Sequence, residues 1–307
     1  MPIRSESPKV SEDIWNDPKI VKDYRSAEKV TLAFAKSLVE QSGILSIRRV
    51  GEPMCILDNA CGTGAVSVVL HGMLPDWKVK NGWNLTCADL SGAMIDAVKT
   101  KIDAEGWGNT STVIEDIQGT SLPAAHYTHV FASFAIMGVP NPEKSLDECL
   151  RILKPGGTLA FTTWKKPGWC DDVNAAIAAM SGNLPQPTPE EFLMSLGNGD
   201  EWHNSSWVEA QLQKRGLENI HVSLVSKSMA TSTVPEMLPA LAPIMAHIPA
   251  RFWNKAQRGQ HGAGFESAVS SYLETKYGVD QPVPMHWIAV VATARKSTAP
   301  ESSCPKI

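Results

Sequence analysis

The feature that most restricts the fold of this chain is a strand-to-helix junction near residue 60. A short apolar run, residues 54–58, ends in an acid. It is followed by the turn Asn59-Ala-Cys-Gly-Thr-Gly64 and by an apolar helix pattern at residues 65–74. Glycines in such a turn let a ligand approach the backbone closely at the amino end of the helix. The junction therefore predicts a ligand site at the start of this helix.

Strand and helix patterns continue to alternate up to residue 164. The pattern predicts further strands at 85–89, 112–115, 127–134 and 158–164, with helices that begin at Ser91 and at Pro142 between them. An N-terminal helix is expected after Ser26, which would be its N-cap. Parallel strands joined by crossover helices have both faces covered, so we expect an open, doubly wound α/β sheet.

The chain beyond residue 164 is less regular, but it returns to the sheet twice. The expected elements are helices near 172–180 and 206–215, a strand at 220–226, helices around 239–257 and 265–277, and a strand at 287–293. We expect a single domain over residues 1–296. Its parts are a core at about 45–164, 203–228 and 285–295, an N-terminal cap at 1–44, and lid insertions at 165–202 and 229–284. Residues 297–307 would be a flexible tail.

Composition and charge exclude several classes of partner. The chain has 28 basic and 32 acidic side chains and a net charge of -4, which gives no attraction to nucleic acid or to an anionic membrane. No apolar run approaches the ~20 residues that span a bilayer, and the N-terminus lacks a signal sequence. The six cysteines contain no C-x-x-C pair, which indicates reduced thiols and no metal site. We expect a cytoplasmic monomer or homodimer that acts on a small molecule.

The acids at the strand ends favour a ligand that carries positive charge. A dinucleotide would bring its pyrophosphate close to Asp58, and Ser67 stands where that fingerprint has its third glycine. S-adenosylmethionine (SAM) has an ammonium group, a sulfonium group and no phosphate. Asp89 ends the second strand and could accept the ribose hydroxyls, and Asp116 follows the third strand and could accept from the adenine amino group. The side chains that could cover the adenine ring are Leu90, Met94 and Ile117.

Residues 56–65 and 151–157, together with Asp89 and Asp116, resemble the class I SAM-dependent methyltransferases. The resemblance implies a Rossmann-like, seven-stranded, mostly parallel sheet with an antiparallel last strand and helical lid insertions. It implies SAM as cofactor, S-adenosylhomocysteine (SAH) as its product, and an N-terminal helix that covers the cofactor. The expected cofactor-binding residues are Tyr24, Asp58, Asn59, Ala60, Gly62, Gly64, Asp89, Leu90, Met94, Asp116, Ile117, Ser133 and Phe134.

A narrower resemblance involves residues 57–67, 85–91, 125–131, 182–192 and 272–278. These segments are similar to small fungal methyltransferases of secondary metabolism, including the enzymes that methylate both thiols of reduced, gliotoxin-like epidithiodiketopiperazines. The resemblance implies S-methylation of a hydrophobic thiol or dithiol. O- or N-methylation of another natural product stays open, because relatives with the same core methylate other atoms. Two other classes would also keep the cofactor motifs, namely an enzyme that binds SAM and catalyses a cyclisation without methyl transfer, and a SAM sensor.

Aromatic and thioether side chains mark the expected acceptor pocket, with core packing as the alternative. The substrate-binding candidates are Trp15, Phe134, Met137, Trp164, Trp169 and Trp253. No residue is marked as a general base, so the catalytic residue stays unassigned. A thiol, with a pKa near ~8.5, depends less on a base than a phenol near ~10, which slightly favours sulfur as the acceptor atom.

Overall fold

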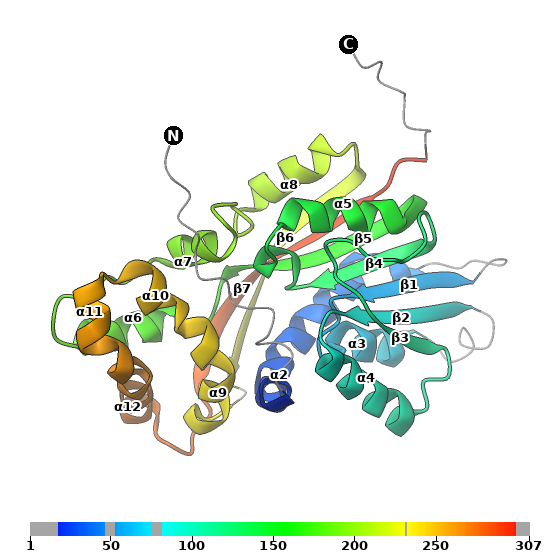
Figure 1. Cartoon of the computed structure of the whole chain (residues 1–307). Coiled ribbons are helices and arrows are strands. Elements are labelled where there is room, and N and C mark those ends of the chain that lie inside the picture. The colour runs from blue at the N-terminus through cyan, green and yellow to red at the C-terminus, as the bar shows by residue number, and fades with distance from the viewer. Residues whose placement is uncertain (1–17, 47–52, 75–81, 231, 299–307) are drawn as a thin grey trace, which may run out of the picture.

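The protein is described by a computed structural model that covers residues 18–46, 53–74, 82–230 and 232–298. Its centre is a seven-stranded sheet in the order β3-β2-β1-β4-β5-β7-β6 (Figure 1). The strands are β1 (Met54–Asn59), β2 (Trp83–Asp89), β3 (Thr110–Ile114), β4 (Tyr127–Ser133), β5 (Leu153–Lys166), β6 (Glu218–Ala230) and β7 (Pro284–Arg295). The first five strands are parallel, and β7 is antiparallel to both of its neighbours. The predicted class I sheet with an antiparallel last strand is confirmed.

Helices cover both faces of the sheet. One face carries α2 (Pro18–Gln41), α3 (Ala65–Met73) and α4 (Gly92–Glu105), and the other carries α5 (Pro142–Ile152) and α8 (Ser205–Lys214) (Figure 1). The side chains of β4 alternate between two apolar clusters, with Phe131 in one and Val130 in the other. A strand that is buried on both sides has this pattern, which explains why the parallel strands are near-continuous apolar runs in the sequence.

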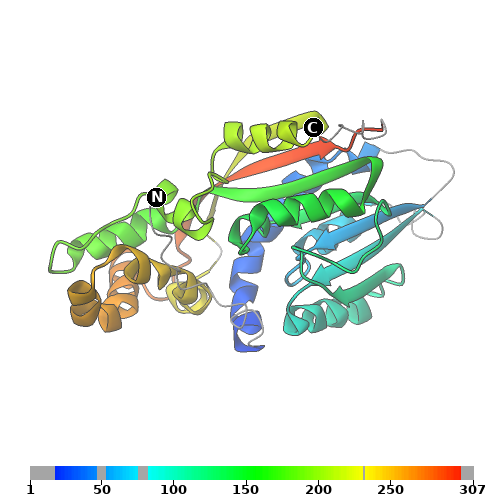
Figure 2. The same cartoon turned by 45° about the horizontal axis from the view of Figure 1, so that its top comes forward.

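The lid insertions form a helical layer beyond one end of the sheet. They comprise α6 (Cys170–Ala179), α7 (Pro189–Leu196), α9 (Val234–Met245), α10 (His247–Phe252), α11 (Lys255–His261) and α12 (Phe265–Tyr277), along with the short 3-10 turn η4 (Gly262–Gly264). Strands β5, β6 and β7 run past their neighbours and support this layer (Figures 1 and 2). Helix α2 lies between α9 of the lid and α4 of the core in both views.

Two predicted helices have other bounds in the structure, and the first lid insertion holds a second helix besides the one expected near 172–180. Helix α2 begins at Pro18, so Ser26 lies inside it and is not its N-cap. The single helix expected around 239–257 is three helices, because Asn254 starts a new capping box with Gln257 after the chain turns at Trp253. The first lid insertion also contains α7, which Thr188 and Glu191 cap reciprocally. Caps made by side chains end and restart helices where apolar periodicity alone predicts continuity.

No helix in the part of the chain that the structure describes is both long enough and apolar enough to cross a bilayer.

Candidate cofactor and acceptor site

The carboxyl ends of β1, β2 and β4 bring most of the predicted cofactor residues to one edge of the sheet. The turn after β1 is held in an unusual backbone conformation, with positive φ angles at Ala60 (54°), Gly62 (54°) and Gly64 (87°). A Cβ atom at Gly64 would lie 3.3 Å from a methyl carbon of Val98. Glycine is therefore required at this position by both its φ angle and its close contact with α4.

Asp89 joins this turn to the start of α4. Its Oδ2 accepts a hydrogen bond from the amide of Gly62 (2.8 Å), and its Oδ1 accepts one from the amide of Ser91 (2.9 Å). Burial raises the pKa of Asp89, and the two amide donors oppose that rise. Each carboxylate oxygen has further acceptor capacity. The carboxylate can therefore receive two more donors, as the two hydroxyls of a ribose would require.

Asp58 faces the first turn of α3. Its Oδ2 accepts from the amide (3.1 Å) and the hydroxyl (2.7 Å) of Ser67. The side chain is 1% exposed, and burial raises its pKa from 3.8 to about 7 against the lowering effect of these two bonds. The hydrogen bonds to Ser67 were not predicted from the sequence. They place a buried carboxyl group directly beneath the turn.

This burial makes the stability of the protein depend on pH. The folded state keeps a proton on Asp58 between pH 4 and pH 7, where the unfolded chain has released it, so the free energy of unfolding falls as pH rises through this window. A pKa shift of this size changes the free energy of unfolding by at most about 4 kcal/mol. We expect Asp58→Asn to remove this contribution to the slope of the free energy of unfolding against pH. The slope is measured by denaturant unfolding between pH 4.5 and 7.5. Asp96→Asn, at an exposed acid of α4, should keep the wild-type slope; equal slopes in all three proteins would contradict the assignment.

The expected adenine side chains lie beside β2 and β3. Met94 and Ile117 are buried, at 3% and 4% exposure, whereas Leu90 is 41% exposed. Asp116 accepts from the amide of Gln118 (2.8 Å) and is partly exposed. The exposed leucine directly after Asp89 leaves apolar surface open next to a polar acceptor.

Tyr24 brings the N-terminal helix to the same edge. Burial raises the pKa of the Tyr24 phenol to about 12, and the nearby carboxylates of Asp89 and Glu28 add to the rise. The tyrosine thus lies close to Asp89, the residue expected to contact ribose. Trp15 lies outside the described residues.

The end of β4 is built around Phe134, whose φ angle is 56°. Its amide donates to the carbonyl and the hydroxyl of Thr162, each at 3.0 Å. Ser133 also contacts that hydroxyl (3.1 Å). The left-handed backbone conformation costs a residue other than glycine ~1–2 kcal/mol in conformational free energy. Residues strained in this way are found most often at functional sites. The bonds from β5 hold the backbone of Phe134 in this conformation.

Aromatic rings gather next to Phe134. Its ring stacks on Trp164 with centroids 3.8 Å apart and planes inclined by 15°, and the sulfur of Met137 accepts from the amide of Trp164 (3.1 Å). The ring of Phe34 contacts both of these rings edge-on, and the ring centroids of Trp287 and Trp164 are 5.1 Å apart. Phe34 and Trp287 were not predicted as site residues, because in the sequence they read only as buried positions of a helix and a strand.

Trp169 and Trp253 lie inside the lid. They are 4% and 2% exposed. Trp169 packs on Phe192, and Trp253 packs on Phe265 while its indole N–H donates to the carbonyl of Pro185 (3.1 Å). These contacts are core packing of the lid helices, which the sequence left as the alternative.

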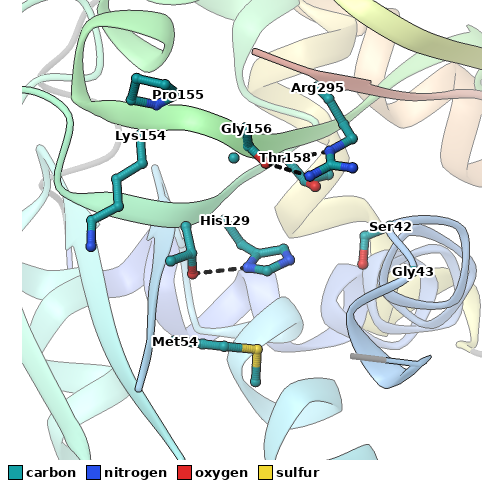
Figure 3. A pocket seen from close by; sticks show the side chains of 11 residues that line it. Ser42, Gly43, Met54, His129, Lys154, Pro155, Gly156, Thr158 and Arg295 are labelled. Atoms are coloured by element: carbon teal, nitrogen blue, oxygen red, sulfur yellow. Dashed lines mark hydrogen bonds between the residues drawn. The ribbon is translucent and has the colours of Figure 1, made fainter. Parts of the chain in front are cut away.

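A pocket of about 280 Å³ lies at the opposite edge of the sheet, near the amino ends of β1 and β4. Figure 3 shows His129 and Arg295 beside it, with the Arg295 guanidinium bonded to the carbonyl of Gly156 (2.9 Å). None of its lining residues is a predicted site residue. Within the described ranges, no group of three or more His, Cys, Asp or Glu side chains is arranged to hold a metal ion.

Comparison with known proteins shows the family of the chain. A family model for a methyltransferase domain matches residues 57–161. The methyltransferase tpcH of Aspergillus fumigatus is 38% identical over 93% of this chain and 99% of that protein. The acetylaranotin bis-thiomethyltransferase of Aspergillus terreus is 39% identical over 89% of this chain and 93% of that enzyme.

Solved structures show the same fold at low sequence identity. The YcgJ protein of Bacillus subtilis has a TM-score of 0.52 and 13% identity, over 87% of this chain and all of that one. A methyltransferase-fold protein from Bacillus halodurans has a TM-score of 0.50 and 16% identity, over 86% of this chain and 99% of that one. The methyltransferase domain match and the two methyltransferase relatives define the chain as a SAM-dependent methyltransferase. Within the class I enzymes, the chain belongs to the fungal methyltransferases of secondary metabolism.

Proposed function

We propose that this enzyme S-methylates a hydrophobic small molecule that carries a thiol or a dithiol, such as a reduced epidithiodiketopiperazine. The single observation that carries the proposal is the 39% identity to a bis-thiomethyltransferase over 93% of that enzyme's length, which includes the lid. The lid matters because it covers the end of the sheet where an acceptor would approach the cofactor. We propose a monomer or homodimer in the cytoplasm that does not bind nucleic acid.

The charge of the turn supports SAM as the ligand of this edge. Two buried or partly buried carboxylates, Asp58 and Asp89, lie at or beneath the turn. A pyrophosphate would be repelled there, whereas an ammonium or sulfonium group is attracted. The turn also leaves open space at Gly62, where a Cβ would meet no atom within 4 Å. The residues present fit SAM.

We assign each part of SAM to a group of residues. The carboxylate of Asp89 accepts hydrogen bonds from the ribose hydroxyls. The turn from Asp58 through Asn59, Ala60 and Gly62 to Gly64, with Tyr24, surrounds the methionine end. The adenine is covered by Leu90, Met94, Asp116 and Ile117, and the sulfonium end lies against the backbone of Ser133 and Phe134.

The acceptor is proposed to lie against the ring stack at the end of β4 and β5. Phe134, Met137 and Trp164 are partly exposed there, so they can contact a ligand. Trp169 and Trp253 support this ring stack from within the lid. Trp15 is a further candidate for contact with the acceptor. The lid thereby determines which acceptors fit.

The chemistry requires alignment more than proton transfer by the protein. When bound, SAM would supply an electrophilic methyl group to the acceptor. The acceptor thiol would give its proton to solvent, its sulfur would form the new S–C bond, and the bond between the methyl group and the sulfonium would break to leave SAH. Phe134 and Trp164 would hold the acceptor and exclude water, which raises the effective concentration of the thiolate at the methyl group. A dithiol that is methylated on both sulfurs consumes two equivalents of SAM.

The test is SAH release with a panel of acceptors, namely a reduced dithiodiketopiperazine, a phenol, a carboxylic acid and an amine. We expect turnover on the dithiol alone, with a product heavier by one or two methyl groups in mass spectrometry. The oxidised disulfide of the same compound is the matched control, and it should release no SAH because it has no thiol. Turnover confined to the phenol, acid or amine would contradict S-methylation. A changed acceptor without SAH release would indicate a cyclisation without methyl transfer.

A further inference from the structure

Helix α2 is held by two different kinds of contact along its length. In its C-terminal half, Ala35, Leu38 and Val39 are fully buried in the apolar cluster with α3. The side-chain amide of Gln41 (Nε2) then donates to the carbonyl of Val291 in the sheet (3.0 Å). Nearer the N-terminus, Glu28 is engaged by an ion pair. Two residues on, Val30 is buried against the lid helices, so the ion pair adds a polar contact to an apolar one where α2 passes the cofactor turn.

That ion pair is made by Lys101 of α4. Its Nζ donates to the carboxylate of Glu28 and to the carbonyl of Thr63 (2.8 Å). The side chains of Lys101 and Glu28 are 28% and 18% exposed, and Thr63 is 3% exposed. We call Glu28, Lys101 and the Thr63 carbonyl the Lys101 bridge. A single ammonium group joins α2, α4 and the cofactor turn.

The position of the bridge couples the cap to the cofactor residues. Thr63 lies between the two glycines of the turn, so its carbonyl belongs to the peptide unit that leads into Gly64. Tyr24 lies four residues before Glu28, on the same face of α2, and it comes close to Asp89. Holding Glu28 against Lys101 therefore holds the turn of α2 that carries Tyr24, whose pKa the carboxylate of Asp89 raises. A partly buried pair is screened less by salt than an exposed one.

We propose that Lys101 is a positioning residue that fixes α2 over the cofactor site through Glu28 and Thr63, so that the bridge limits the rate at which SAM and SAH leave. This inference rests on the proposed function only for the placement of the cofactor at the turn. The bridge takes no part in methyl transfer, and it acts by closing the site.

Lys101→Met tests the proposal, because methionine keeps most of the apolar stem and removes the ammonium group. We expect the dissociation rate constant of SAH to rise roughly tenfold, the effect of losing a partly buried ion pair and its hydrogen bonds. Glu28→Gln should raise the rate in the same direction, and the double variant should add little to Lys101→Met. Lys101→Arg should return the rate to within about threefold of wild type. The rate is measured by stopped-flow displacement of SAH from the full-length enzyme.

The matched control is Lys99→Met, which breaks an exposed pair with Asp96 on the same helix and should leave the rate unchanged. Unchanged SAH release from both Lys101→Met and Glu28→Gln would overturn the proposal. A second readout needs no ligand: amide hydrogen exchange over residues 18–28 should quicken in Lys101→Met and not in Lys99→Met. If the wild type failed to bind SAM, the proposed function would fall, and the exchange experiment would still decide whether the bridge holds α2.

Discussion

Asp89→Ala is expected to weaken SAM binding by about 100-fold or more in isothermal titration calorimetry. The variant loses an ionised acceptor for two ribose hydroxyls, and hydrogen bonds to a charged group contribute about 1.5–3 kcal/mol each. It also frees the amides of Gly62 and Ser91, which Asp89 holds at 2.8 and 2.9 Å. The turn is then less ordered before the ligand arrives, which adds to the loss.

The control for this variant is Asp96→Ala, which removes an exposed acid from α4, the helix that follows β2. It should bind SAM as the wild type does, because its carboxylate contacts only Lys99 in the described structure. Thermal unfolding of both variants checks that the sheet is intact. Normal SAM affinity in a folded Asp89→Ala variant would contradict the cofactor assignment as a whole.

Gly64→Ala is the second change with a large expected effect. Alanine at a φ angle of 87° is strained, and its Cβ would lie 3.3 Å from Val98 and 3.7 Å from Ser67. We expect a loss of about 2–3 kcal/mol in the free energy of unfolding, part from the left-handed backbone and part from the close contacts. SAM affinity should fall by at least about tenfold, because relief of the contact moves the amino end of α3 away from the ligand.

Gly106→Ala separates backbone strain from the effect on the site. Gly106 ends α4 with a φ angle of 68°, and a Cβ there would meet no atom within 4 Å. This variant should lose stability through strain alone and should keep its affinity for SAM. The interpretation of Gly64 would be wrong if both variants lost SAM affinity equally, since the loss would then follow global stability.

The order of elements and the cofactor turn could be predicted because they depend on residues that are close in the chain. The β1–turn–α3 junction needs only an apolar run, two glycines and a second apolar run within about twenty residues. The helix that Asn141 caps, with Pro142 at its start, was likewise predicted from adjacent residues and is present. Helix boundaries were less predictable in the lid, where a capping box at Asn254 competes with apolar periodicity that runs across it.

The roles of individual aromatic residues could not be separated in advance. Trp164 and Trp253 look alike in the sequence, since each lies in an apolar segment at or after β5. In the structure, Trp164 stacks on Phe134 at the edge of the sheet, whereas Trp253 is fully buried against Phe265. Exposure depends on which segments pack together, and composition does not carry that information.

What could be worked out from the chain alone was the class of protein and its cofactor, together with a proposal for the edge of the sheet that binds it. Only the tertiary structure decided how the site is held. Asp89 bonds an amide 27 positions earlier in the chain, and Lys101 bonds a carboxylate 73 positions earlier. Local sequence sets turns and helix caps through neighbouring atoms. Contacts at these separations exist only after the sheet has aligned the carboxyl ends of its strands and α2 has packed across them.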